Sequence, residues 1–341
     1  MKQNRNKPKS VYFTKDIQDR QNVDLLVHGQ GVLLFKQENN NSPCIFYIYN
    51  QDKTDGLKIE FTIESVSITE ISSKKILDDP SNNKGLTNNN GAYYWFSIDS
   101  QNQRLYVGIG EARLDTVIYE YLYENISKDK EFFEKNKQFL ESLVSIQIAT
   151  ESTSIIPMRL LRDPITQDVP LFVKDTNELT MTDIAEGTFL PDSNLSPTSQ
   201  ILYNSISGKK FVLNDNNFPD FSKAIEYSIA TPGMWCNTKL KEKSTEFSKD
   251  TPNLLETYLR ITLGENNGES PGIPYVMEIW PVNHYSPIHS HAEADAIIRV
   301  LHGEINVTLY PYLCAEKDGV NPFGVANFKE GDITWISPTL N

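Results

Sequence analysis

The chain has 341 residues, and its 45 acidic and 32 basic residues give it a formal net charge of -13. This negative charge argues against binding to nucleic acid or to anionic membranes, whose phosphate groups attract basic proteins. A hydrophobic content of 39%, with 16 Tyr and 16 Phe, is enough to build folded cores, which excludes a disordered protein.

The length predicts two domains or one large domain. No apolar run approaches the roughly 20 residues of a membrane-spanning helix. Residues 1–10 are basic and polar with no apolar segment behind them, so we expect a disordered tail rather than a signal peptide. The cysteines are scattered and odd in number, which favours reduced thiols and a cytoplasmic location.

Short apolar runs separated by polar turns predict an antiparallel β-sandwich over residues 11–150. The strand signals are a strand–turn–strand pattern at 24–35, single strands at 44–49 and 57–71, and a hairpin at 92–110. An amphipathic helix is expected over residues 128–143. This region has no catalytic motif, and its role stays open between a ligand- or glycan-binding module and an interaction domain.

Prolines break up residues 151–195, which we interpret as a Pro-rich connector. Ser196-Pro197 is typical of a helix start, because Ser caps the free N–H groups and Pro fits the first turn. The expected helices span residues 196–206, 222–229 and 238–247. We expect them to open a further domain over residues 196–341.

The most informative motif is Pro287-Ile288-His289-Ser290-His291. Two histidines at positions i and i+2 of a strand point to the same face, so their imidazoles can converge on one metal ion. Neutral imidazole is a good ligand for iron, zinc, copper and nickel. The chain has five histidines, and a pair at this spacing indicates a metal site. Two ordinary exposed histidines on a polar strand give the same pattern.

The residues around this pair resemble the first cupin motif, Gly-x(5)-His-x-His-x(3,4)-Glu-x(6)-Gly. Asn283 stands at the first Gly position, the two histidines fit, and Gly303 fits the last position. The Glu position falls on Ala296, which cannot bind a metal, and the neighbouring Asp295 is expected on the opposite face of the strand. The resemblance therefore implies a cupin with three metal ligands rather than four.

Within the cupins, the C-terminal part resembles cysteine dioxygenase. The residues that match the spacing of that family are Tyr258, Leu259, Arg260, Trp280, His284, His289, His291 and Gly303. The resemblance implies that His289 and His291 hold a ferrous ion. It also implies that Arg260 binds the substrate carboxylate and that Tyr258 lines the same pocket. The predicted fold is mainly β, with an N-terminal β-sandwich-like domain and a C-terminal cupin (double-stranded β-helix) portion preceded by a few helices.

Two departures from the family stand out. The position of Ala296 is a cysteine in the mammalian-type enzymes, where it crosslinks to a tyrosine near the iron. The second cupin motif, which supplies the third histidine, begins at Gly331 with one residue more than usual, and its histidine position falls beyond Asn341. We therefore expect the cupin domain over residues 196–341 to be truncated before its third ligand.

These residue types suit one chemistry. Three neutral histidines leave Fe(II) with open positions for a thiolate and O2, and an arginine fork holds a carboxylate at two points. The leading hypothesis is a thiol dioxygenase that oxidises a small, cysteine-like thiol carboxylate to its sulfinate with O2. The alternatives are a non-catalytic cupin with a binding or structural role, and another metal-dependent cupin enzyme, for which zinc is a suitable metal.

Overall fold

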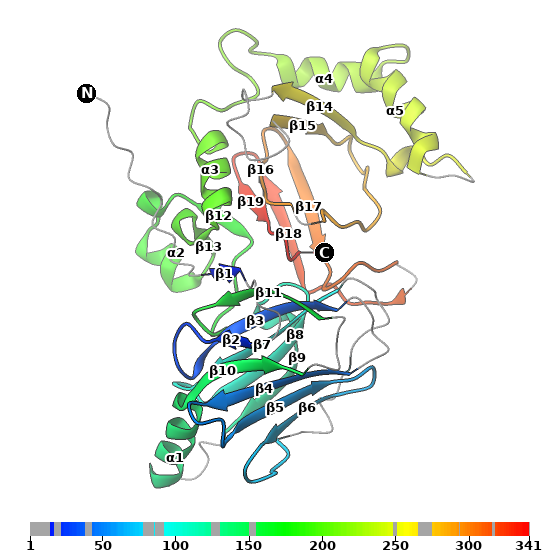
Figure 1. Ribbon diagram of the computed structural model, residues 1–341. Coiled ribbons are helices and arrows are strands. Elements are labelled where there is room, and N and C mark those ends of the chain that lie inside the picture. The colour runs from blue at the N-terminus through cyan, green and yellow to red at the C-terminus, as the bar shows by residue number, and fades with distance from the viewer. Residues whose placement is uncertain are drawn as a thin grey trace.

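The structure is a computed structural model that describes residues 14–16, 22–37, 43–77, 85, 92–123, 130–149, 155–247, 251–264, 275–292, 294–315 and 318–340. The tail expected over residues 1–10 lies outside this part of the chain. Two antiparallel sheets form the lower half in Figure 1, and helices with shorter strand pairs form the upper half. The prediction of a mainly β protein with an N-terminal sandwich is confirmed.

One sheet of the sandwich has the strand order β1-β11-β3-β7-β8-β9, and the other has the order β2-β10-β4-β5-β6. All neighbouring strands are antiparallel. The first sheet comprises Thr14–Asp16 (β1), Ile155–Leu161 (β11), Gln30–Gln37 (β3), Tyr93–Asp99 (β7), Arg104–Ile109 (β8) and Val117–Leu122 (β9). The second comprises Asn22–Asp24 (β2), Leu143–Ile148 (β10), Cys44–Asn50 (β4), Gly56–Phe61 (β5) and Val66–Glu70 (β6). Helix α1 (Lys130–Glu141) confirms the predicted amphipathic helix.

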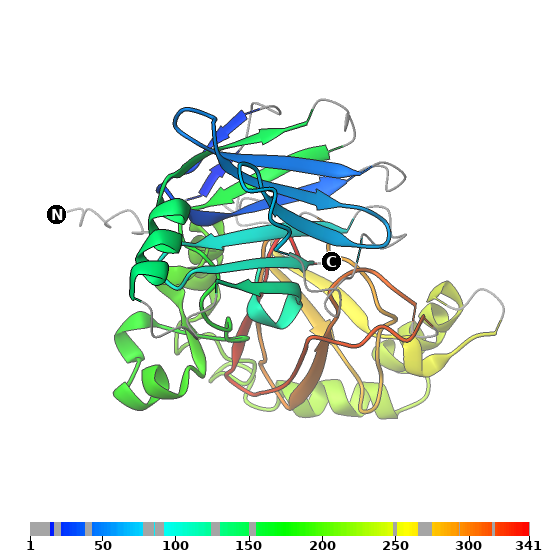
Figure 2. The ribbon, with the colours of Figure 1, turned by 90° about the horizontal axis from the view of Figure 1, so that it is seen from below.

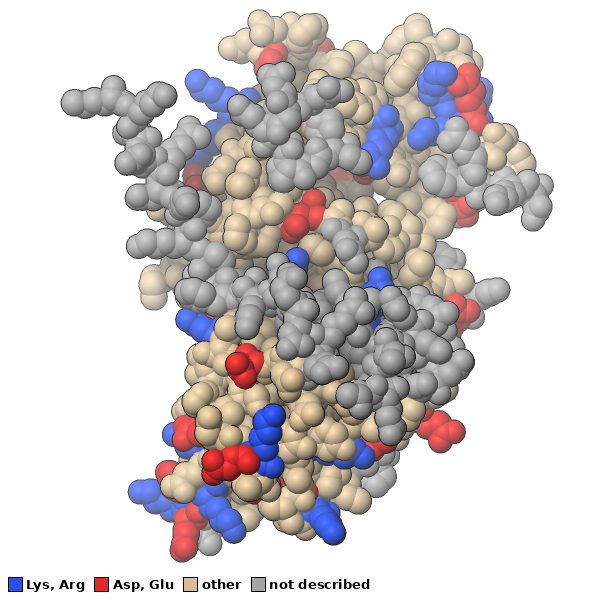
Figure 3. All heavy atoms as spheres, in the orientation of Figure 1, with Lys and Arg blue, Asp and Glu red and all other residues tan. Residues whose placement is uncertain are grey.

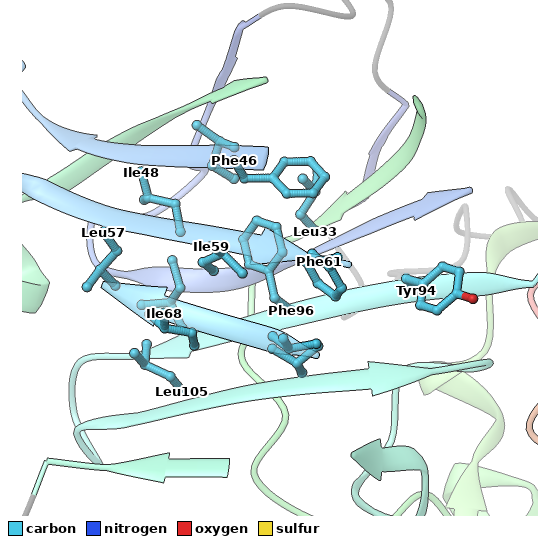
Figure 4. Packing of buried hydrophobic residues seen from close by; sticks show 14 of the residues in the cluster. Leu33, Phe46, Ile48, Leu57, Ile59, Phe61, Ile68, Tyr94, Phe96 and Leu105 are labelled. Carbon is cyan, nitrogen blue, oxygen red and sulfur yellow. The ribbon is translucent and has the colours of Figure 1, made fainter. Parts of the chain in front are cut away.

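The core lies between the two sheets and is built from alternate residues of each strand (Figure 4). In β4, Cys44, Phe46 and Ile48 are buried, whereas the residues between them are only half-buried. Alternate side chains point to opposite faces of a strand, so this alternation marks one face as the core face. Aromatic rings meet across the sheets, with the centroid of Phe46 4.7 Å from Phe35 and 5.3 Å from Phe96.

Two sequence expectations need correction. Residues 57–71 form the hairpin β5–β6 rather than one strand, with a turn in which the Thr62 N–H donates to the Ser65 carbonyl. The proposed connector contributes β11 to the sandwich. Pro157 is tolerated there because the pairing with β3 shifts register between Pro157 and Arg159, and a bulge does not need every backbone N–H.

Strand β7 is buried along its whole length because it has a partner on each face. Phe96 lies in the sandwich core, whereas Trp95 lies on the opposite face with Tyr106, packed against Leu161 and Ile165. In Figure 2, β7 and β8 (cyan) lie between the blue strands of the five-stranded sheet and the C-terminal strands. One face of this sheet therefore packs in the sandwich core, and its other face is turned toward the C-terminal half.

The C-terminal half has helices and three antiparallel strand pairs. Its pairs are Leu259–Gly264 (β14) with Tyr275–Ile279 (β15), Ala296–Arg299 (β16) with Ile333–Ile336 (β19), and Glu304–Leu309 (β17) with Gly324–Lys329 (β18). Strands Phe172–Lys174 (β12) and Phe189–Pro191 (β13) pair in parallel on either side of α2 (Met181–Glu186) in the sequence. The remaining helices are Pro197–Ile206 (α3), Phe221–Ala230 (α4) and Trp235–Phe247 (α5), which confirms the three that we expected. As predicted, Ser196 caps α3 by accepting the Ser199 N–H.

The surface is chemically mixed. On the face drawn in Figure 3, Lys and Arg side chains are interspersed with Asp and Glu, and no single sign dominates a large area of the described residues. None of the helices that the structure describes is both long and apolar enough to cross a membrane.

A buried ion pair joins the two halves. Arg113 and Glu111, in the segment between β8 and β9, lie 2.6 Å apart, and their side chains are 2% and 9% exposed. The guanidinium group lies 5.9 Å from the ring centroid of Trp335 in β19. The other carboxylate oxygen of Glu111 accepts the Ser337 hydroxyl at 2.5 Å, directly after β19. The buried charges of Arg113 and Glu111 in the sandwich therefore interact with Trp335 and Ser337 of the C-terminal half.

Removing one member of this pair leaves the other charge buried without its counter-charge. We predict that Arg113→Ala lowers the free energy of unfolding by about 3–5 kcal/mol, measured by denaturant unfolding of the whole chain. The matched control is Arg162→Ala, which removes a solvent-exposed pair with Asp163 and should lower the free energy of unfolding far less. Equal losses in the two variants would contradict the interpretation.

Candidate functional site

His289 and His291 lie in the irregular connection between β15 and β16, so the expectation that they share a strand is wrong. Backbone geometry explains the difference. Pro287 offers no N–H to a neighbouring strand, and Asn283 and Ala292 adopt left-handed conformations, with φ of 64° and 53°. These residues interrupt an extended ladder on both sides of the histidine pair.

The connection nevertheless brings the two imidazoles together. The ring centroids of His289 and His291 lie 4.9 Å apart, with an angle of 54° between the ring planes. The Nδ1 atom of His289 lies 2.8 Å from the Pro287 carbonyl oxygen, which can only accept a hydrogen bond. This contact places the proton on Nδ1 and leaves Nε2 with a lone pair in the neutral ring. Both side chains are exposed.

Arg260 and Tyr258 come from the start of β14. Leu259, between them, is buried with α5 residues, so Tyr258 and Arg260 share the opposite, open face. The Tyr258 ring stacks on Trp280 with centroids 4.1 Å apart and an angle of 10° between the planes. Arg260 is paired in register with Glu278 of β15, and its Nε atom lies 3.9 Å from Glu278 Oε1.

The electrostatics connect these residues into one site. Partial burial lowers the pKa of the His291 imidazole, and the nearby His289 and Arg260 lower it further, although the side chain stays accessible. Burial raises the pKa of Tyr258, Glu278 raises it further, and Arg260 lowers it. We therefore define the candidate site as Tyr258, Arg260, Glu278, His289 and His291.

Glu278 was missed by sequence reasoning. The only sequence signal for it was its place two residues before Trp280, on a strand whose alternate residues share a face. That signal becomes informative once the pairing register of β14 and β15 is known, because the register sets Glu278 directly opposite Arg260.

His289 and His291 place two imidazoles close together. Among the described residues, no set of three or more His, Cys, Asp or Glu is arranged to hold a metal ion. Three further residues that could act as ligands make hydrogen-bond contacts with other groups. His284 Nδ1 contacts the Thr257 carbonyl at 2.8 Å, and His302 contacts Glu226 at 3.0 Å. Asp295 accepts hydrogen bonds from the hydroxyls at the start of α3, which agrees with its expected place away from the histidine pair. A pair of imidazoles fits part of an iron or zinc site.

The three residues that stand at glycine positions of the cupin pattern all have positive φ. Asn283 stands at the first of these positions with φ of 64°, and Asn is among the residues that tolerate this region. Gly303 and Gly331 have φ of 72° and 94°, and an added Cβ would meet no atom within 4 Å at either position. Backbone conformation rather than lack of space therefore makes glycine suitable at these two turns.

No family model matches the chain, and no curated protein matches it. Among solved structures, a galectin from Caenorhabditis elegans is 9% identical and covers 43% of this chain and 94% of its own, with a TM-score of 0.30. The CBM40 module of the Ruminococcus gnavus IT-sialidase, bound to α2,6 sialyllactose, is 13% identical and covers 45% of this chain and 94% of its own, with a TM-score of 0.28. These likenesses are too weak to assign a fold family or a function.

The low pKa of His291 gives a direct test of the site. We predict that NMR titration of the histidine ring signals places His291 below the ordinary value of 6.5. A lowered pKa means that the neutral, metal-binding form persists to lower pH and is lost only as the pH falls through the lowered value.

Arg260→Gln removes one cause of the shift, so the His291 titration should move upward in that variant. Arg162→Gln, an arginine of the sandwich, serves as the control and should leave the titration unchanged. If the pKa of His291 is the same in Arg260→Gln as in the unaltered chain, Arg260 does not act electrostatically on the histidine pair, and the result contradicts the site as defined here.

Proposed function

We propose that this chain carries a cupin-type thiol dioxygenase site similar to that of cysteine dioxygenase. The observation that carries the proposal is that His289 and His291 lie together, with ring centroids 4.9 Å apart, within the electrostatic reach of Arg260. The left-handed Asn283, Gly303 and Gly331 at the cupin glycine positions support the same assignment. The buried free cysteines Cys44 and Cys236 agree with a reducing, cytoplasmic setting.

The reaction adds both atoms of O2 to the sulfur of one thiol, so that R–SH and O2 give R–SO2H without another reductant. A bound ferrous ion supplies open coordination positions for the thiolate and O2. His289 and His291 would hold that ion through their Nε2 or Nδ1 atoms, and the contact of His289 Nδ1 with Pro287 favours Nε2 for this ring. The third histidine of the family is not among the described residues.

Arg260 and Tyr258 position the substrate. The Arg260 side chain is 52% exposed on the open face of the hairpin, so its guanidinium can receive a carboxylate at two points. The Tyr258 ring is fixed by its stacking on Trp280 and forms a flat wall beside Arg260. Fixing the carboxylate end orients the thiol end toward the histidine pair, and holding reactants in one geometry supplies much of the catalysis such a site requires.

Oxygen uptake by the iron-loaded protein tests the proposal. We predict that cysteine or 3-mercaptopropionate consumes O2 with one sulfinate formed per O2. His289→Ala should abolish iron binding and turnover, because one of two described ligands is lost. Arg260→Lys keeps the charge but loses the planar fork, so KM should rise about 10-fold or more while kcat changes less.

His302→Ala is the matched control, because this histidine contacts Glu226 and lies outside the candidate site. It should keep both iron and turnover. Iron binding without uptake of O2 with any thiol would instead favour a non-catalytic binding cupin. Hydrolytic or isomerase activity supported by zinc but not by iron would favour the other metal-dependent cupin enzymes.

A further inference from the structure

The outer face of the five-stranded sheet points away from the sandwich core. In β4 the buried residues Phe46 and Ile48 face that core. Tyr47 and Tyr49 alternate with them along the strand, so their side chains point outward. Figure 2 shows β7, β8 and the C-terminal strands on the inner side of this sheet. The C-terminal half therefore does not cover the outer face, and the proposed dioxygenase site makes no use of it.

One row of outward side chains crosses all five strands of the sheet. Tyr47 of β4 is paired in register with Gln147 of β10 and with Lys58 of β5. Gln147 is in turn paired with Asn22 of β2, at one edge of the sheet. Lys58 is paired with Thr69 of β6, at the other edge. Paired residues point to the same face, and neighbouring strands lie about 4.8 Å apart, so the row spans roughly 19 Å.

Two parallel aromatic rings lie at the centre of this face. The ring centroids of Tyr47 and Tyr49 are 5.7 Å apart, with an angle of 10° between the ring planes. The residues paired with Tyr49 are small, Ser145 on β10 and Gly56 on β5, and add little bulk beside its ring. The face of an aromatic ring carries partial negative charge and attracts weakly positive C–H groups. The two rings are therefore suited to a ligand that presents a flat surface of C–H groups.

Polar groups surround the two rings. Lys58 Nζ lies 2.5 Å from Glu60 Oε2, and the two side chains are 33% and 27% exposed. This pair places donors beside an acceptor. The Gln147 amide and the hydroxyls of Tyr47 and Tyr49 have no hydrogen-bond partner within the part of the chain that the structure describes. Groups that both donate and accept match ligand hydroxyls, each of which also does both.

We propose that the outer face of the five-stranded sheet binds a neutral oligosaccharide, a function independent of the thiol dioxygenase proposed above. A pyranose ring has a face of C–H groups and a rim of hydroxyls, so it packs on Tyr47 and Tyr49 while its rim bonds to Gln147. Neighbouring hydroxyls of the sugar bridge the Lys58–Glu60 pair. The row is longer than one sugar ring, which favours an oligomer that lies across the strands.

The charges on this face favour a neutral ligand over an anionic one. Lys58 is the cation of the row, and Glu60 already neutralises it. Asp24 is paired with Ser145 and therefore points outward at the β2 edge, where it is exposed. An acidic polysaccharide would meet the charge of Asp24 without gaining an unpaired cation, and like charges brought together weaken binding.

Saturation-transfer NMR on the whole chain, which detects weak binding, tests the proposal. The neutral probes are lactose, cellotetraose and maltotetraose, and the anionic probe is trigalacturonate. We expect at least one neutral probe to bind, and to bind about 10-fold more weakly to Tyr47→Ala. Tyr47→Phe keeps the ring and should retain most of the affinity. The matched control is Tyr227→Ala, which removes a tyrosine that is 60% exposed on α4 and should leave the affinity unchanged.

Glu60→Gln keeps the shape of the side chain and removes its charge, so it tests the polar contacts even where Tyr47→Ala does not fold. It should weaken binding of the same neutral probe. The proposal is overturned if none of the neutral probes binds, if trigalacturonate binds more tightly than all of them, or if the folded variants keep the full affinity. Loss of saccharide binding in Tyr47→Ala with unchanged O2 uptake would support a saccharide site separate from the dioxygenase site.

Discussion

The buried ion pair of Arg113 and Glu111 is the constraint on which the C-terminal half depends. Glu111 divides its two oxygens between Arg113 and the Ser337 hydroxyl, so the end of β19 is tied to the sandwich. Strand β19 pairs with β16, with Ile336 opposite Ala296. Strand β16 follows the histidine connection closely in the chain. The sandwich therefore contributes to the placement of the candidate site.

The candidate site combines neutral and charged groups within a small region. Two imidazoles face one another, and the lowered pKa of His291 keeps its ring neutral over a wider pH range. Arg260 is one cause of that shift, so the residue proposed to bind the substrate also favours the protonation state that the proposed metal ligand needs. Glu278 balances the charge of Arg260 without closing on it.

Sequence patterns predicted most strands of the sandwich and the helices α1, α3, α4 and α5, because alternation, helical periodicity and the Ser196-Pro197 start are local signals. They failed where the decisive contact is not local. The turn between β5 and β6 is closed by Thr62 and Ser65 and contains no Gly or Pro, so the sequence pattern did not indicate a turn there. Strand β11 was not predicted because Pro157 argued against a strand, whereas the structure accommodates this proline at a bulge. The partnership of Arg260 with Glu278 required the strand register, which the sequence pattern left open.

The most direct test of the central claim is X-ray absorption at the iron edge on the iron-loaded chain and on the double variant His289→Ala/His291→Ala. The account predicts imidazole scattering around the iron in the unaltered chain, and its loss together with most of the bound iron in the double variant. The same iron content and the same imidazole signal in both proteins would contradict it, because the metal would then be held by residues outside the candidate site.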